Sequence, residues 1–370
     1  MSELMTYIEV STPAGVRIAQ LDQYLKLAYA RAVNDIGTLV LELDPNSDAS
    51  LYQRDTRLGV WRQGPNGALA LDTECVWFVR KVKRVLAASG ERRLRVTAYS
   101  ANELLRRRIV AYNAGSAQAQ KSDYADDMMK EVVAENLGAS ATDTDRRWST
   151  YLTIAGDLSA GQDIDKAFSR RNVLTVLQEL ADASAEAGTN LYFDIVTPTP
   201  GALVFATYTG QRGDDRTIAT GAPVLFSPEL GNLADGELEE DYANEVTVVY
   251  AAGKGEGDER EVVEVEDTAR SGASLFNRIE ALRDARNAET TAELTAEGNG
   301  FLKAGRPRLL FGGSIVDTPQ CRYGVEWKWG DKVTVQFEGR QFDAHINSIQ
   351  VAISDGNETI KAILKTEDTL

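Results

Sequence analysis

The sequence predicts an α+β, β-rich fold with two small β-barrel (tube-like) domains, separated by an α+β insertion and a helical segment. Three observations indicate this. Short segments of alternating apolar and polar residues occupy both ends of the chain, turns rich in Gly, Pro and Asn separate them, and amphipathic helical stretches lie in the middle. We therefore expect an N-terminal β domain at residues 1–118, an α+β domain at 119–225 and a second β domain at 226–370.

The clearest local signal is a β-hairpin over residues 24–43. Leu27 and Tyr29 alternate with small or polar residues in its first arm, and Leu39 and Leu41 do so in the second. Alternation with period two predicts strands with one buried face. The residues between the arms, Asn34-Asp-Ile-Gly37, include types that tolerate positive φ, so they predict the reversal.

The rest of the first domain reads as short strands closed by one helix. The strands are expected at Thr6–Val10, Val16–Ala19, Gly59–Gln63, Ala68–Leu71, Val76–Val82 and Arg92–Tyr99. Ala101–Arg108 predicts a short helix that caps them. The composition changes near Gly115, close to the boundary that we expect at residue 118.

The middle of the chain predicts two helices followed by a hairpin. Ser122 is expected to N-cap a helix that ends at Leu137, before Gly138. A second helix is expected from about Ser169 to Ala187. Asn190–Val196 and Ala202–Tyr208 then predict two strands across a Pro-rich turn.

The last third returns to strands. Glu245–Ala251 and Arg260–Glu266 predict a hairpin around a glycine-rich loop, and a helical segment is expected at about 275–304, with a break near Asn287. Further strands are expected at Leu309–Phe311, Gly313–Val316, Asp331–Phe337, His345–Ile353 and Thr359–Leu364.

Composition restricts the classes of function. The chain has 370 residues, 43% of them hydrophobic, and a formal net charge of −16. Nucleic-acid binders usually carry the opposite sign, so the charge disfavours stable binding to DNA phosphates. No apolar run approaches the ~20 residues of a membrane helix. The N-terminus has no secretory signal pattern, and we expect assembly in a cytoplasm.

Few residues offer catalytic or metal-binding chemistry. His345 is the only histidine and lies in an alternating strand, so it is interpreted as structural. Cys75 and Cys321 are too few and too far apart for a thiolate site. The loop from Gly253 joins two strands, whereas a phosphate-binding loop joins a strand to a helix. We predict no catalytic residue, no cofactor site and no metal site.

Two groups of charged residues are candidates for contacts. The basic group suggests either a surface for an acidic partner or salt bridges with the chain's own acids, and it contains Arg80, Lys81, Lys83, Arg84, Arg106, Arg107 and Arg108. The acidic group suggests a solvated loop, a channel wall or a Ca²⁺ site without the usual ligand order, and it contains Asp235, Glu237, Glu239, Glu240 and Asp241.

Several motifs, taken in order, resemble one protein family. They span most of the chain: Arg31–Gly37, Trp77–Arg80, Leu104–Tyr112, Asp126–Asn136, Arg171–Gln178, Gly210–Arg216, Phe226–Asn232 and Tyr323–Val333. Together they resemble the tail-tip (baseplate) hub, or tail-associated, proteins of long-tailed siphophages.

This resemblance implies a structural virion protein at the tail tip. It implies a homotrimer in which two barrels per subunit form a ring that closes the tail tube and lines the DNA exit channel, without stable DNA binding. The implied partners are a distal tail or tube protein ring, the tape measure protein and tail fibre or receptor-binding proteins.

Two alternatives from other classes stay open. The first is a peripheral receptor- or carbohydrate-binding tail module, for which the five tryptophans, Trp61, Trp77, Trp148, Trp327 and Trp329, are candidate contacts. The second is a cell-wall hydrolase. A single histidine and two isolated cysteines make its active site hard to build, although carboxylate pairs are available among 56 acidic residues.

Overall fold

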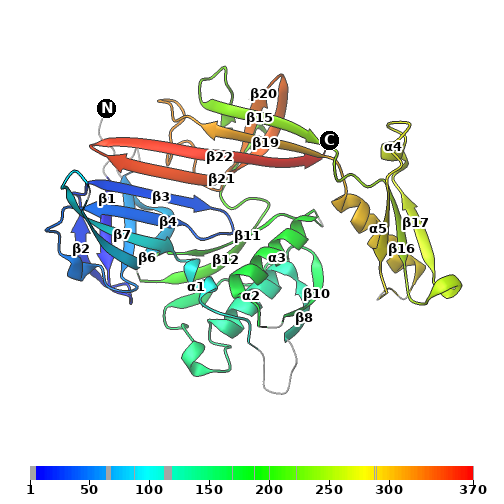
Figure 1. Ribbon diagram of the computed structural model, residues 1–370, viewed down its shortest axis with the longest axis horizontal. Coiled ribbons are helices and arrows are strands. Elements are labelled where there is room, and N and C mark those ends of the chain that lie inside the picture. Colours follow the sequence, from blue (N-terminus) through cyan, green and yellow to red (C-terminus); the bar gives the residue numbers. More distant parts are fainter. Residues whose placement is uncertain are drawn as a thin grey trace. The chain divides into compact units, whose positions relative to one another are not determined.

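The computed structural model describes residues 6–63, 68–86, 88–111, 119–168, 170–186, 188–199, 201–221, 223–286, 288 and 290–369. Within these ranges the chain forms two compact units. The larger unit contains the described residues up to Ala185 together with Thr189–Gly236 and Gly313–Leu364. The smaller unit contains Glu237–Gly312 and short segments beginning at Glu186 and Lys365 (Figure 1). The predicted boundary near Gly115 lies outside the described residues.

Most strands belong to one 14-stranded sheet, which confirms a β-rich fold. The N-terminal strands are β1 (Thr6–Ser11), β2 (Arg17–Leu21), β3 (Lys26–Ala32), β4 (Thr38–Leu43), β5 (Arg57–Gln63), β6 (Leu69–Leu86) and β7 (Arg92–Ser100). The C-terminal strands are β13 (Asp215–Arg216), β14 (Leu225–Phe226), β15 (Leu233–Asp241), β19 (Arg308–Ile315), β20 (Lys332–Phe337), β21 (Arg340–Ser354) and β22 (Asn357–Thr369).

The two sets of strands join along β3 and β21, which pair antiparallel. The strand order is β15-β19-β22-β21-β3-β4-β7-β6-β5-β1-β2, with β20 on β21 and the short β13 and β14 on β20. The closure of each set into a barrel, and the division at 118 and 225, stay predictions.

The hairpin expected over residues 24–43 is confirmed. Strands β3 and β4 pair antiparallel with Tyr29 opposite Leu39, and both side chains are buried. Asn34, in the turn, has a φ of 55°, a conformation that asparagine tolerates better than most residues. Local alternation and turn chemistry therefore determine this element.

Within the described residues, the α+β segment contains three α-helices, the first of them short, and two small sheets. Its elements are the short helix α1 (Glu103–Arg106), helices α2 (Ala125–Asn136) and α3 (Val173–Glu186), and strands β8 (Ala119–Tyr124), β9 (Leu152–Ile154), β10 (Asp163–Phe168), β11 (Leu191–Val196) and β12 (Leu203–Thr209). The predicted hairpin is confirmed, because β11 and β12 pair antiparallel. The predicted N-cap at Ser122 is wrong: Ser122 lies in β8, and α2 begins after Tyr124 without a side-chain cap.

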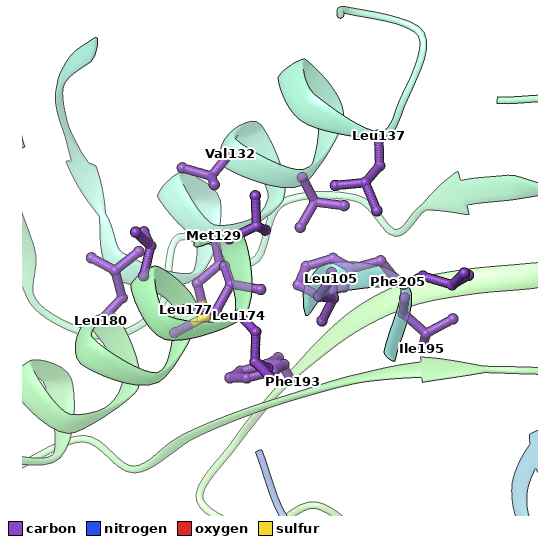
Figure 2. Packing of buried hydrophobic residues seen from close by; sticks show 14 of the residues in the cluster. Leu105, Met129, Val132, Leu137, Leu174, Leu177, Leu180, Phe193, Ile195 and Phe205 are labelled. Atoms are coloured by element: carbon purple, nitrogen blue, oxygen red, sulfur yellow. The ribbon is translucent and has the colours of Figure 1, made fainter. Parts of the chain in front are cut away.

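The apolar faces of α2 and α3 form a core with this hairpin. Figure 2 shows Met129 and Val132 of α2 and Leu177 of α3 gathered with Phe193 and Phe205 of the two strands. All five side chains are buried. The helical spacing of the apolar residues in the sequence correctly predicted these buried faces.

A buried charge cluster links this core to both sets of strands. Arg31 of β3 lies 2.6 Å from one carboxylate oxygen of Asp194 in β11, and Arg212 lies 2.9 Å from the other. Both guanidinium groups lie over the ring of Trp329, at 4.5 and 4.9 Å. Burial alone would raise the pKa of Asp194, but the two arginines outweigh it and hold that pKa below its usual value.

A second buried cluster of polar and charged side chains connects the C-terminal strands to the N-terminal ones. The hydroxyl groups of Tyr29 and Tyr323 both donate to the carboxylate of Asp72, the latter at 2.5 Å. Arg62 lies 3.6 Å from Asp72 and also pairs with Glu358 of β22. Residues almost 300 positions apart in sequence therefore share one hydrogen-bonded network.

Within the described residues, the smaller unit has a three-stranded sheet with one short and one longer α-helix. Its elements are β16 (Val248–Ala252), β17 (Val262–Glu266), β18 (Glu280–Asp284), α4 (Thr268–Ser271) and α5 (Thr291–Ala304). The β16–β17 hairpin was predicted and is confirmed. The first half of the helix expected at about 275–304 is wrong, because Glu280–Asp284 pairs parallel with β16. The second half is α5, which begins with a capping box of Thr290 and Glu293.

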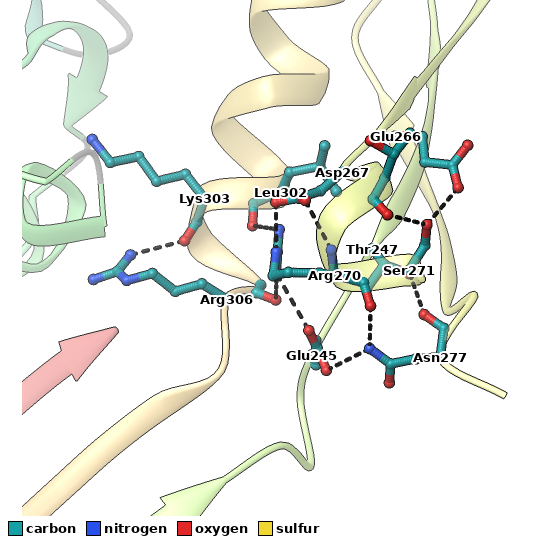
Figure 3. Close-up of polar contacts among 12 residues, drawn as sticks. Glu245, Thr247, Glu266, Asp267, Arg270, Ser271, Asn277, Leu302, Lys303 and Arg306 are labelled. Atoms are coloured by element: carbon teal, nitrogen blue, oxygen red, sulfur yellow. Dashed lines mark hydrogen bonds and ion pairs between the residues drawn. The ribbon is translucent and has the colours of Figure 1, made fainter. Parts of the chain in front are cut away.

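A hydrogen-bonded network around Arg270 holds the smaller unit together (Figure 3). Its guanidinium donates to the carbonyl oxygens of Leu302 and Gly305 at the end of α5, at 3.0 and 3.1 Å. It also lies 2.7 Å from Asp267 and 3.7 Å from the buried Glu245. One side chain thus satisfies carbonyl groups that a helix end leaves without partners.

We expect Arg270→Ala to open the smaller unit locally. Among the described residues, the apolar cluster of this unit is small, with Ala251, Ala285 and Leu294 at its centre and Val263 and Ala288 packed against them. The charged hydrogen bonds, worth about 2 kcal/mol in total, therefore matter more than usual. Amide hydrogen exchange should accelerate in β16–β18 and α5, but not in the core around Phe205. The matched control is Arg278→Ala, which removes exposed ion pairs and one exposed hydrogen bond, to the hydroxyl of Tyr250, in the same unit. Equal acceleration in both variants would contradict this role of Arg270.

Candidate interaction surfaces

The second half of β6, which ends at Leu86, extends beyond the residues that pair with β5. Strand β5 pairs with β6 only as far as Phe78, and the register with β7 shifts between Val79 and Lys81. Residues Cys75–Val79 are buried, whereas the five residues from Arg80 to Arg84 are exposed. Within the described part of the chain, the outer edge of β6 pairs with no strand beyond this shift.

This end of β6 carries positive charges that form no ion pair with the described acidic residues. No ion pair between described residues involves Lys81, Lys83 or Arg84. By contrast, Arg80 pairs with Asp55 at 2.9 Å, and Arg95 of the facing strand pairs with Glu42 at 2.6 Å. We call Lys81, Lys83 and Arg84 the basic ribbon end. Because charges without partners cost little to place in water and gain most from an acidic partner, this segment is a candidate contact surface.

The arginines that follow Leu105 lie against their own chain. Arg106 pairs with Glu103 at 2.5 Å, and Arg107 pairs with Asp55 at 2.9 Å. Arg108 lies over the ring of Trp148 at 4.0 Å. These contacts support the interpretation as internal salt bridges for Arg106 and Arg107. Their role in contacts with a partner stays a prediction.

The acidic group lies on β15, the strand at one end of the large sheet. Asp235, Glu237 and Glu239 alternate along it and are exposed, and none of them has an ion-pair partner among the residues described. Glu240 accepts a hydrogen bond from Tyr242, and Asp241 caps the following turn. The described residues contain no group of three or more His, Cys, Asp or Glu arranged to hold a metal ion.

The other candidates for chemistry are half-buried, as His345 is, or buried, as both cysteines are. Burial lowers the pKa of His345 to about 4, so the ring is neutral at pH 7, and it packs 5.9 Å from the ring of Tyr192. Both cysteines are buried free thiols, and burial raises the pKa of each. Buried thiols with raised pKa values are poor nucleophiles. No helix in the described ranges is long and apolar enough to cross a membrane.

The basic residues were predictable from the sequence, but the strand arrangement that leaves them exposed was not. The register shift after Val79 and the end of β5 pairing depend on neighbouring strands. In the sequence, the basic residues between Arg80 and Arg84 are the signal that this part of the strand is exposed to solvent on both faces. Exposed Val82 and Leu86 add apolar surface to the same ribbon.

The fold is similar to that of solved phage tail proteins. The tail protein from Neisseria meningitidis MC58 aligns with a TM-score of 0.56 and 14% identity, over 98% of this chain and 96% of that one. The 43 kDa tail protein of prophage MuSo2 from Shewanella oneidensis aligns with a TM-score of 0.56 and 13% identity, over 99% and 100%. Prophage tail protein gp18 from Listeria monocytogenes EGD-e gives 0.54 and 10%, over 97% and 94%.

Comparison at the level of sequence gives a family. No curated protein matches the chain. The family described as Siphovirus ReqiPepy6 Gp37-like protein matches residues 7–364, which is nearly the whole chain. This confirms the resemblance to siphophage tail proteins that the motifs indicated. The chain belongs to the siphovirus Gp37-like family and is a tail protein of the siphovirus type.

Proposed function

We propose that this protein is the hub of a siphophage tail tip. In this proposal three copies form a ring that closes the tail tube, connects it to distal tail, tape measure and host-contacting proteins, and lines the DNA exit channel. The protein performs no catalysis. Its place is the tip of the virion tail, and its assembly takes place in the host cytoplasm.

The observation that carries the proposed contacts is the basic ribbon end. Three cations without internal partners lie on a strand whose outer edge pairs with no other described strand. On a protein of net charge −16, such a cluster favours an acidic partner ring. The exposed carboxylates of β15 have the opposite character. They suit a channel wall along which DNA passes without being held, because like charges repel.

The alternatives make different demands. A cell-wall hydrolase needs a polarised cluster of titratable groups, and the charge clusters described above are buried ion pairs inside the fold. A peripheral binding module needs exposed aromatic rings. Trp77, Trp327 and Trp329 are buried in the structure, which leaves Trp61 and Trp148 as partly accessible candidates.

The first test is the symmetry of intact tails. Cryo-electron microscopy of tail tips should show three copies of this protein around a central pore. A single copy at a lateral position would overturn the hub proposal and favour the peripheral module.

The second test is a charge reversal on the basic ribbon end. We expect the triple variant Lys81→Glu, Lys83→Glu, Arg84→Glu to enter tails at least about tenfold less often than wild type when the two compete, because each desolvated pair at an interface contributes substantially. The copies per tail can be counted by mass spectrometry. The melting temperature should stay near that of wild type, since these residues have no internal partners.

The matched control reverses three exposed charges elsewhere: Arg54→Glu, Lys328→Glu, Lys361→Glu. It makes the same change in net charge. If this variant is excluded from tails as strongly as the ribbon variant, net charge and not the ribbon determines incorporation.

A further inference from the structure

The smaller unit exposes two adjacent apolar side chains. Leu275 and Phe276 lie in the turn between α4 and β18, and their exposed fractions are 97% and 90%. No other large apolar side chain in the described ranges is more than 66% exposed. Single exposed apolar residues are common on protein surfaces, but an adjacent aliphatic and aromatic pair exposed to this degree is typical of a contact with another molecule.

The turn that carries this pair is held at its base by Asn277. The backbone N–H of Asn277 donates to the carbonyl oxygen of Ser274 at 3.2 Å, and its own carbonyl oxygen accepts from the hydroxyl of Thr247 at 2.7 Å. The side-chain amide of Asn277 donates to the carbonyl oxygen of Arg270 at 2.8 Å (Figure 3). Because the turn is fixed in the free protein, the entropic cost of placing its two apolar side chains in a contact is low.

Carboxylates lie close to the same turn. The next arginine along the chain, Arg278, forms ion pairs with three glutamates. They are Glu264 at 2.8 Å, Glu266 at 3.3 Å and Glu280 at 2.9 Å. Three carboxylates around one guanidinium leave negative charge beside the apolar pair, and Asp and Glu also outnumber Lys and Arg over residues 237–312. An anionic membrane would be repelled, so the pair fits a protein surface that is both apolar and basic.

The basic ribbon end lies on a surface of this kind. Val82, Arg84 and Leu86 are two residues apart along β6, so their side chains lie on one face of the strand. Val82 and Leu86 are exposed, and no ion pair between described residues involves Arg84. A cation between two exposed apolar side chains matches an apolar pair beside carboxylates in both charge and hydrophobic surface.

The symmetry of a ring requires two different surfaces of this sort. Each copy in a threefold ring contacts its neighbours head-to-tail, and neither surface here can face itself without like charges meeting. We propose that the Leu275–Phe276 turn of one copy packs on Val82 and Leu86 of the next copy, with the glutamates beside the turn facing the basic ribbon end. This inference rests on the hub proposal, because it names the contact by which the three copies join.

Cysteine pairing in assembled tails tests the contact. We expect the double variant Leu86→Cys, Phe276→Cys to form disulfides between copies with oxidised glutathione, seen as bands of two and three chains on a non-reducing gel. The native cysteines are buried. Each single variant should stay at the mass of one chain, and so should the control pair Val16→Cys, Phe276→Cys, in which Val16 is about as exposed as Leu86. A disulfide within one chain, or none at all, overturns the proposal.

Competition for assembly into tails gives a second measurement. We expect Leu275→Ser, Phe276→Ser to enter tails about tenfold less often than wild type, because apolar anchors contribute much of the energy of an interface. Adding these changes to the triple charge reversal of the basic ribbon end should cause no further loss, since both break one contact. Multiplied losses, about hundredfold in total, would show two separate contacts and overturn the proposal.

A matched control removes exposed apolar side chains elsewhere. Val16→Ser, Leu25→Ser should enter tails like wild type, and both serine variants should keep the wild-type melting temperature, because all four side chains are exposed. Equal exclusion of the control would mean that the Leu275–Phe276 turn has no special role.

Cryo-electron microscopy of wild-type tails separates this inference from the hub proposal. A threefold ring, together with no disulfide between copies in the cysteine variant, overturns this contact alone and leaves the hub in place. A single lateral copy overturns both.

Discussion

Replacing Asp194 by alanine is expected to destabilise the larger unit by about 3–5 kcal/mol, because it leaves the buried Arg31 without a counter-ion and Arg212 with only the exposed carboxylate of Glu74. Arg31 is fully buried, and its Nε and Nη1 atoms already have no hydrogen-bond partner. Removal of the one carboxylate that both arginines share therefore leaves excess positive charge in the protein interior. The free energy of unfolding, measured by urea titration with circular dichroism, checks this value.

Two control variants separate charge from packing. Glu74→Gln removes a carboxylate that also contacts Arg212 but whose side chain is 61% exposed, so we expect a loss below about 1 kcal/mol. The combined variant Arg31→Met, Asp194→Leu, Arg212→Met removes all the charges. It should be more stable than Asp194→Ala, since apolar residues of similar size often replace buried ion pairs without loss. If it is less stable, the cluster stabilises the fold by its specific geometry.

Truncation of Phe205 is the second substitution with a large expected effect. Phe205 is fully buried between the hairpin and the helices, and its ring stacks on that of Phe193 at a centroid distance of 6.3 Å. Phe205→Ala should lower the free energy of unfolding by about 3–5 kcal/mol, through lost burial and the cavity left behind. Thermal unfolding followed by calorimetry measures this loss.

The size of the loss should follow the volume removed. Phe205→Leu keeps most of the apolar volume and should cost no more than about 1.5 kcal/mol. Val204→Ala alters the adjacent residue on the opposite, less buried face of β12 and should cost less than Phe205→Ala. Equal losses of unfolding free energy in all three variants would mean that the core shown in Figure 2 does not determine the stability of this unit.

Elements with a local cause were predictable from the sequence. The hairpin of β3 and β4 combines period-two alternation with Asn34 and Gly37, all within twenty residues. The buried faces of α2 and α3 follow from helical spacing alone. Neither prediction needs information about the partner strands.

The wrong predictions have non-local causes. Ser122 has the chemistry of an N-cap, but pairing of β8 with β10, forty residues away, keeps it in a strand. Residues 280–284, Glu-Ala-Leu-Arg-Asp, include strong helix formers, yet parallel pairing with β16 makes them β18. Tertiary pairing outweighs an intrinsic preference of a few tenths of a kcal/mol per residue.

The candidate sites divide in the same way. Lys81, Lys83 and Arg84 could be selected by composition, although their lack of internal partners depends on where β5 ends. Arg57 has no distinctive sequence context. Its guanidinium donates to the carbonyl oxygen of Gly201, 144 residues further along the chain, so only the structure shows that this arginine is buried.

The position of the smaller unit in the chain has an evolutionary consequence. Strands β15 and β19 are neighbours in the large sheet, so the residues between them occupy the place of a hairpin loop. Loops between paired strands accept insertions with little effect on the sheet, because the entropy of closing them grows slowly with length. The sheet can therefore accept, exchange or lose a whole folded module at this point while its strand order is preserved.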